Sequence, residues 1–341
     1  MNTKFYLLLA IVFAVSSDVC VFGQGKDANA AEILGHYEES LSWLQSVSME
    51  IDTRITQKGY QDKPSYYERN FVFRRDGSRI ECRGQVLVFD DKGDVNLPQS
   101  FDFKEVMTGL RSLSVRNSID KPPVSANISG HYEDYQKRVL DSPNYGGPLG
   151  GKIFGNNRKS VAELLGESAN LHLRDEQENI NGVSCYVLEG TTKYGEVTAW
   201  IAPQKGYNAL KWTIHKTGDD LFHERPISSN SWLAVFDSVE LQKVGDVFVA
   251  KDGNFTLTID HSDGRTTVSR YEYKISNIQL NPDFEALGAF KIDLPDGTRV
   301  FVEESPGVRY IWQDGKIVPD VDTPTFEEID KTVDELKASG H

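Results

Sequence analysis

The sequence contains none of the short motifs that mark common catalytic or nucleotide-binding sites. It has no Gly-x-Ser-x-Gly, no P-loop, no Gly-x-Gly-x-x-Gly fingerprint and no His-Glu-x-x-His element. Its seven histidines include no pair at the helical spacing that binds a metal, and it has no Cys-x-x-Cys. These absences predict a protein that is not an enzyme and that uses no cofactor or metal ion.

An excess of basic residues is also missing. Lysine and arginine number 37 against 51 aspartates and glutamates, which gives a formal net charge of −14. Nucleic acids and anionic membrane surfaces attract proteins through clusters of basic residues. The composition therefore argues against nucleic acid and against anionic lipid headgroups as surface partners.

Only one long apolar run occurs, and it lies at the N-terminus. Lys4 is followed by apolar residues at 5–15 and then by small and polar residues up to Gly23. This is the layout of a secretory signal peptide, and the run is shorter than the roughly 20 residues that cross a bilayer. We predict that residues 1–23 are removed and that the protein is exported, periplasmic or extracellular, and soluble without a transmembrane segment. The alternative is lipidation at Cys20, although Val19 stands where a small residue is expected.

Cysteine is scarce. After removal of the leader only Cys82 and Cys185 remain, each within a strand-like run. In an oxidising compartment the two could form a disulfide, which would stabilise the fold by closing a long loop. The alternative, two buried thiols that behave as small apolar side chains, stays equally open.

The periodicity of apolar residues changes early in the chain and then persists. Residues 29–47 place apolar side chains at spacings of four, four and three, which predicts an amphipathic helix, and residues 47–55 alternate as a half-buried strand does. Further strands are predicted at 66–74, 79–89, 183–189, 196–202, 209–216, 232–244, 247–250, 254–261 and 266–278. Turns between them are expected at Asp76-Gly77, Lys92-Gly93, Asp252-Gly253 and Asp263-Gly264. This pattern predicts a meandering antiparallel sheet.

The middle of the chain loses this alternation. Residues 104–168 are interrupted by proline and glycine, and we predict an insertion of short helices and loops within a domain that spans 24–302. Ser160 is the expected N-cap of a short helix at 161–165, and residues 133–140 are expected to form another helical turn.

Residues 303–341 form an acidic tail. Thr325 and Glu328 match a capping box, which predicts a last helix. Its apolar residues fall near one face, and they are Phe326, Ile329, Val333 and Leu336. We expect this helix to dock on its own domain, with docking on an envelope protein partner as the alternative.

Two neighbouring segments resemble a known family. Residues 180–188, Ile-Asn-Gly-Val-Ser-Cys-Tyr-Val-Leu, read as a strand after an Asn-Gly turn. Residues 196–206, Glu-Val-Thr-Ala-Trp-Ile-Ala-Pro-Gln-Lys-Gly, read as a strand that ends in a Trp-Ile-x-Pro corner before a return strand. Together with the leading helix and the sequential strands, this arrangement resembles the outer-membrane lipoprotein-sorting proteins with the LolA/LolB-like fold, over about residues 31–294. Ala202 departs from the pattern, because that corner usually has Asp.

The resemblance implies an α+β fold. It is a curved, half-open antiparallel β-sheet or barrel, covered by an N-terminal helix and inserted short helices, that binds lipid acyl chains on its apolar concave face. It therefore implies a non-catalytic periplasmic carrier of lipids or lipoproteins. Two alternatives are an envelope structural or protein-interaction protein without a lipid cavity, and a hydrolase that would use His215, His223 or His261 beside a carboxylate.

A lipid cavity of this kind needs one sheet face lined with aliphatic and aromatic side chains. The residues that could line it are Met49, Ile51, Phe71, Phe73, Val86, Val88, Trp200, Trp212, Ile214, Leu257 and Ile259. The alternative is that the same side chains form an ordinary core beneath the covering helices.

Overall fold

The computed structural model describes residues 29–59, 64–90, 92–108, 111–119, 125–129, 139–140, 142–152, 155–156, 159–303, 305 and 308–320. Within these residues, no helix is long and apolar enough to span a membrane.

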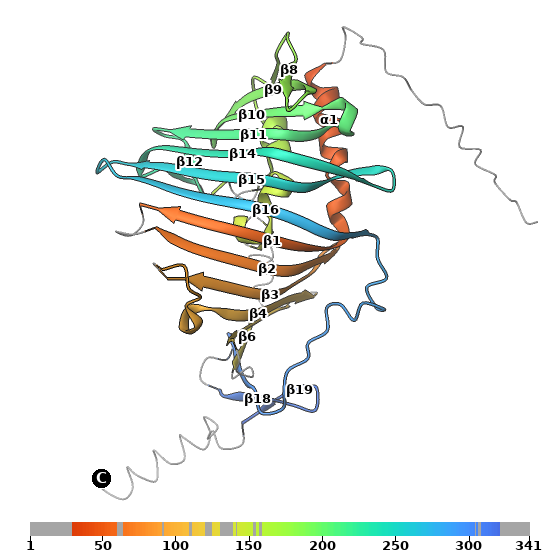
Figure 1. Cartoon of the computed structure of the whole chain (residues 1–341), viewed down its shortest axis with the longest axis vertical. Helices are drawn as coiled ribbons and strands as arrows, with labels where there is room; N and C mark the ends of the chain where they lie inside the picture. The colour runs from red at the N-terminus through yellow and green to blue at the C-terminus, as the bar shows by residue number, and fades with distance from the viewer. Residues whose placement is uncertain are drawn as a thin grey trace, which may run out of the picture.

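A single 17-stranded sheet dominates the fold. Following the hydrogen-bonded pairs from one edge to the other gives β8 (Glu178–Ile180), β9 (Val183–Thr192), β10 (Gly195–Ala202), β11 (Asn208–Thr217), β14 (Ser229–Val244), β15 (Val247–His261), β16 (Thr266–Leu280), β1 (Ser46–Lys58), β2 (Ser65–Asp76), β3 (Arg79–Phe89), β4 (Phe101–Thr108), β5 (Arg111–Ser118), β6 (Ser125–Ser129), β17 (Arg299–Val302), β18 (Tyr310–Gln313) and β19 (Lys316–Pro319). The short β7 (His172–Leu173) also pairs with β9, and β12 (Leu221–Phe222) pairs with β13 (Arg225–Pro226) outside the sheet. All described pairs are antiparallel except β6–β17, and the two edges do not pair, so the sheet is open (Figure 1).

Alternation along the strands gives the sheet two different faces. The inner face is the one that carries Ile51, Phe71 and Trp212, and these side chains belong to the largest apolar cluster of the molecule. On β1 the burial pattern alternates strictly from Ile51 to Ile55, as expected for a strand with one dry and one wet face. The inner face therefore collects the apolar half of each long strand.

Short helical elements lie on this inner face. They are α1 (Ala30–Ser40), η1 (Ser42–Gln45), η3 (Pro143–Tyr145), η4 (Gly147–Gly150) and α3 (Val161–Gly166). Figure 1 shows α1 in red and the yellow-green segments on the same side of the sheet. The N-terminal helix covers only part of the face, because its contacts with the sheet are to β9 and β11.

Side-chain caps fix both α-helices. The side chain of Asn29 accepts a hydrogen bond from the Glu32 amide at 2.8 Å. At α3, the Glu163 amide donates to the Ser160 hydroxyl at 3.2 Å, and the Ser160 amide donates to the Glu163 carboxylate at 2.6 Å. This capping box confirms the predicted start of the helix at Val161.

A second apolar cluster lies on the outer face of β4, β5 and β6. It includes Val106 and Leu113 from these strands, and Phe290, Leu294 and Trp312 from the returning C-terminal part of the chain. The second half of β4 is thus buried on both faces, whereas β5 and β6 are buried mainly on the outer one.

Most predicted strands are confirmed within two or three residues of their ends, but one predicted turn is wrong. Asp252-Gly253 lies inside the continuous strand β15. A Cβ at Gly253 would stand 2.7 Å from the ring of Phe236, so the glycine is required by close packing rather than by a turn.

The predicted domain limits need two corrections. Residues 101–129 contain β4, β5 and β6 where an insertion of helices and loops was expected from 104, whereas η3, η4 and α3 occupy its later part. Strands β18 and β19 extend the sheet to Pro319, past the predicted boundary at 302. The leader at 1–23, most of the turn expected at 133–140 and the last helix expected after Thr325 lie outside the described residues.

The disulfide left open by the sequence is not formed. Cys82 and Cys185 are both free and buried. They lie on β3 and β9, with β2, β1, β16, β15, β14, β11 and β10 between them. Because a disulfide needs Cα atoms within about 7 Å, the alternative of two buried thiols describes this fold.

Candidate functional site

The cover segment, defined here as residues 142–152, lies across the inner face and contains η3 and η4. Pro143 and Pro148 each occupy an early position of a turn, where a missing amide is tolerated. Gly146 has a φ of 80°, and its left-handed conformation ends the first turn and starts the second. The local sequence thus dictates two tight turns rather than one regular helix.

Aromatic and apolar side chains of the cover segment insert into the sheet. The ring of Tyr145 lies edge-on to Phe71 and to Phe103, with centroids 6.0 Å apart in both cases. The hydroxyl of Tyr273, from β16, donates a buried hydrogen bond of 2.7 Å to the carbonyl of Pro143. Leu149 is buried in the main cluster. The cover therefore forms the second wall of the apolar core.

The space between cover and sheet is closed. The cavity lies where α1 and η4 face β11 and β14, and its lining includes Tyr37, Leu149, Trp212 and Phe236. Its volume is about 10 Å³, which is at the lower limit for one water molecule. An acyl chain fits beneath the cover only if the cover moves away from the sheet.

Most of the residues predicted to line a cavity do come together. Eight are buried in the main apolar cluster, and they are Met49, Ile51, Phe71, Phe73, Val86, Trp212, Ile214 and Leu257. Val88 and Ile259 are partly buried at its margin.

Trp200 is the exception. It belongs to a separate cluster on the other face of the sheet, beside Cys185 and Leu210. Its indole nitrogen donates to the Glu178 carboxylate at 2.7 Å, and Lys211 lies 4.3 Å from its ring centroid. Trp200 sits one position out of register with the inner face, since its neighbour Ala199 pairs with Trp212.

The most unusual residue of the inner face was not among the predicted ones. Arg69 is only 7% exposed. Its guanidinium carbon lies 4.6 Å from the ring centroid of Tyr145, 5.0 Å from that of Phe103 and 5.9 Å from that of Phe71. A signal was present in the sequence, because Arg69 precedes Phe71 and Phe73 at the period of two that marks the inner face.

Several polar atoms around Arg69 have no hydrogen-bond partner among the described residues. These are Nε of Arg69, Oγ1 of Thr53 on the neighbouring strand, and Oε2 of Glu105 on β4. The nearest cation to the Glu105 carboxylate is Arg116, at 3.8 Å. Burial, with the charge of Glu105 adding to it, raises the pKa values of the Cys82 thiol and the Tyr145 hydroxyl. Thiol and phenol are therefore held in their neutral forms.

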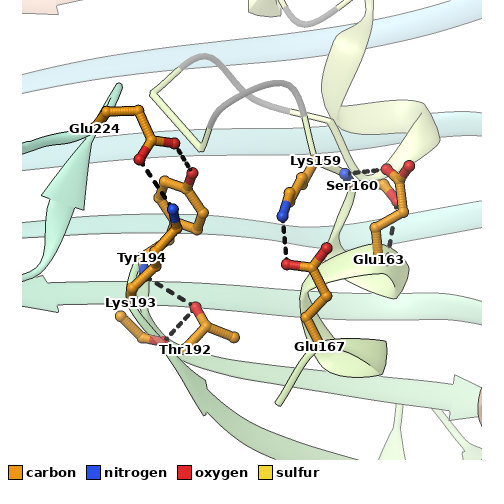
Figure 2. A network of polar contacts seen from close by, with 9 residues as sticks. Lys159, Ser160, Glu163, Glu167, Thr192, Lys193, Tyr194 and Glu224 are labelled. Atoms are coloured by element: carbon orange, nitrogen blue, oxygen red, sulfur yellow. Dashed lines mark hydrogen bonds and ion pairs between the residues drawn. The ribbon is translucent and has the colours of Figure 1, made fainter.

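A second buried cation lies elsewhere, at Lys216 on β11. Its ammonium donates to the carbonyls of Tyr194 at 2.7 Å and Leu221 at 2.9 Å. Burial lowers the pKa of Lys216 to about 7. The hydroxyl of Tyr194 donates to Glu224, which also accepts from Lys193 at 2.9 Å (Figure 2). This network links the turn between β9 and β10 to the β12–β13 hairpin, so its role is structural.

A groove lined mainly by polar side chains lies on the opposite, outer face. Its volume is about 460 Å³. Its lining includes Asp52, Arg54, Asn70, Glu272 and Lys274. The guanidinium of Arg54 lies 3.4 Å from the carboxylate of Glu68 and 3.9 Å from that of Glu272, so its charge is paired across adjacent strands. Charged and polar side chains thus dominate the lining of this groove.

Other chemistry finds little support in the described part of the chain. No group of three side chains that could hold a metal ion occurs there. His215 lies 3.9 Å from Glu196 with both side chains largely exposed, and His261 lies 3.2 Å from the hydroxyl of Thr267. Neither histidine lines the closed space or the outer groove.

Solved structures offer distant matches. A DUF1329 family protein from Desulfovibrio piger is 12% identical, with a TM-score of 0.39, over 74% of this chain and 92% of that one. A LolA superfamily protein from Nitrosomonas europaea is 15% identical, with a TM-score of 0.33, over 79% and 96%. An outer membrane lipoprotein-sorting protein domain from Vibrio parahaemolyticus is 13% identical, with a TM-score of 0.37, over 75% and 94%.

Two of these three structures are of the kind that residues 180–206 resemble, a LolA superfamily protein and an outer membrane lipoprotein-sorting protein domain. No family model matches the chain, and no curated protein matches it.

Proposed function

We propose that this chain is a non-catalytic carrier that binds the acyl chains of a lipid or lipoprotein along the inner face of its sheet. The structure then represents the form in which the cover segment is closed on the sheet. The cover segment at 142–152 occupies the place of the ligand, and binding displaces it from the sheet.

The contacts of the cover segment with the sheet are the observation that supports this proposal. Its apolar contacts, made by Tyr145 and Leu149, are of the non-directional kind that an acyl chain can replace. Exposing two such side chains costs roughly 1.5–3 kcal/mol each, whereas burying a chain of about 15 methylenes gains roughly 0.8 kcal/mol per methylene. An acyl chain of this length can therefore replace the apolar contacts that the two side chains lose.

The leader at 1–23 supports an envelope or extracellular site of action, where such a carrier meets lipids and lipoproteins as partners. The alternative of an envelope interaction protein without a lipid site is an outcome of the test below. In that case the inner face is a permanently closed core.

Quenching of tryptophan fluorescence by palmitate brominated along its chain tests the proposal. Trp212 lines the closed space, and Trp200 on the other face provides a matched control. Trp43 lines the same space, so we expect saturable quenching that falls in Trp212→Phe, falls further when Trp43 is also replaced, and is unchanged in Trp200→Phe. Absence of saturable quenching, or quenching that depends on Trp200, contradicts an acyl site under the cover.

A further inference from the structure

Arg69 is a cation buried in an apolar face, and no carboxylate of the described residues lies within 4.0 Å of it. Its partners are the rings of Tyr145, Phe103 and Phe71. Stacking on aromatic rings offsets only part of the cost of removing a guanidinium from water, and the Nε–H remains without an acceptor. A fold that needed only packing here would be better served by a leucine or methionine.

Glu105, the buried carboxylate of this region, faces the largely exposed Arg116 at 3.8 Å, so Arg69 is left without an ion-pair partner among the described residues. Thr53, the cross-strand neighbour of Arg69, adds a buried hydroxyl without a partner. The Nε–H of Arg69 and the Thr53 hydroxyl, both without acceptors on the inner face, match the hydrogen-bonding needs of a carboxylate or phosphate.

The position of Arg69 relative to the cover is equally specific. Arg69 on β2 lies beneath Tyr145 of the cover segment, and Trp212 on β11 lines the closed space together with Leu149 of the same segment. Five strand-to-strand steps separate β2 from β11, which corresponds to about 24 Å at roughly 4.8 Å per step. Between them the rings of Tyr273 and Phe236 lie 6.5 Å apart, and those of Phe236 and Trp212 lie 5.6 Å apart. Beyond Thr53, the path along the sheet therefore runs over aromatic rings, and its length is comparable to that of a long fatty-acyl chain.

We propose that Arg69 binds the anionic headgroup, a carboxylate or phosphate, of an acyl ligand whose chain runs under the cover segment towards Trp212. The inference rests on the proposed function and names its ligand class, an amphiphile with one acidic headgroup. When the ligand enters, Tyr145 leaves the guanidinium and the headgroup takes its place. The acidic surface of the protein excludes anionic membranes, whereas Arg69 acts on a single molecule in the interior.

Calorimetric titration of the full chain with palmitate, with hexadecanol and with acetate tests this assignment. Palmitate and hexadecanol share one chain and differ in headgroup charge, and acetate carries the charge without the chain. Because hydrogen bonds to a charged group are stronger than neutral ones, we expect palmitate to bind at least about tenfold more tightly than hexadecanol, with no measurable binding of acetate. In Arg69→Met the difference between palmitate and hexadecanol should fall below about threefold, while Arg69→Lys should retain part of it.

The outcomes separate the two proposals. Equal binding of palmitate and hexadecanol by the unaltered protein overturns the role of Arg69 and leaves the acyl site intact. A preference for palmitate that persists in Arg69→Met places the headgroup elsewhere and also overturns it. Binding of acetate as tight as that of palmitate contradicts an amphiphile as the ligand class, and absence of binding by both chains overturns the acyl site itself. The comparison within the unaltered protein remains decisive if a variant does not fold.

Discussion

Loosening the cover should tighten ligand binding while destabilising the protein. Tyr273→Phe removes the hydroxyl that donates to the Pro143 carbonyl at 2.7 Å, and the ring contacts with Phe236 and Tyr271 remain. A buried carbonyl that loses its donor costs about 1–2 kcal/mol. We therefore expect the free energy of unfolding to fall by about that amount.

Loss of the Tyr273–Pro143 hydrogen bond also favours the open form, in which the cover segment has left the sheet. The apparent affinity of a ligand scales with the fraction of molecules that can accept it, and in the closed form the cavity beneath the cover is only about 10 Å³. A shift of about 1–2 kcal/mol towards the open form raises affinity roughly 5- to 30-fold. Titration with palmitate measures the affinity, and urea unfolding measures the stability. Tyr194→Phe is the control, because its hydroxyl donates to Glu224 away from the cover. A Tyr273→Phe variant that binds palmitate more weakly than the unaltered protein refutes displacement of the cover.

Three further predictions concern the framework. The pKa of Lys216 is about 7 in the folded chain, against an ordinary value of 10.5. Between pH 7 and 10.5 the unfolded chain therefore binds one more proton than the folded chain. The free energy of unfolding should rise with pH in that window by up to about 1.4 kcal/mol per pH unit. Urea unfolding measured across this pH range should show the rise in the unaltered protein and no such rise in Lys216→Met. Gly253→Ala should lower the unfolding free energy by about 1–3 kcal/mol through its clash with the ring of Phe236, and Phe236→Leu should offset part of the loss, whereas additive losses in the double variant contradict the contact. Alkylation without reductant should leave Cys82 and Cys185 unmodified in the folded protein and label both after denaturation, and failure to label them then would indicate a disulfide.

The sheet was predictable wherever one face is dry and the other wet. The strands from 46 to 89 and from 183 to 280 alternate clearly, and their predicted positions are confirmed. Strand β4 escaped prediction because both of its faces are buried: Glu105, Val106 and Met107 are consecutive and all almost inaccessible. Burial on two sides removes the alternation that identifies a strand.

The side chains that share the inner face could be predicted from the sequence, but the way in which the cover segment closes that face could not. Period-two positions identified Ile51, Phe71 and Trp212, because inward side chains of neighbouring strands share a face. Trp200 was assigned to the wrong face of the sheet, because a shift of one residue along a strand moves a side chain to the opposite face. The glycines and prolines of the cover segment indicated turns, but only the tertiary structure shows those turns inserted into the inner face. Arg69 was overlooked because a charged residue at an inward position is rare.

The most direct test of the account is a crystal structure of the protein grown with bromine-substituted palmitate, in which anomalous scattering locates the chain. The account predicts bromine between the inner face and a displaced cover segment, near Trp212, with the carboxylate against Arg69. Bromine in the outer groove beside Asp52 and Lys274, or a cover segment still seated on the sheet with palmitate bound elsewhere, would contradict it.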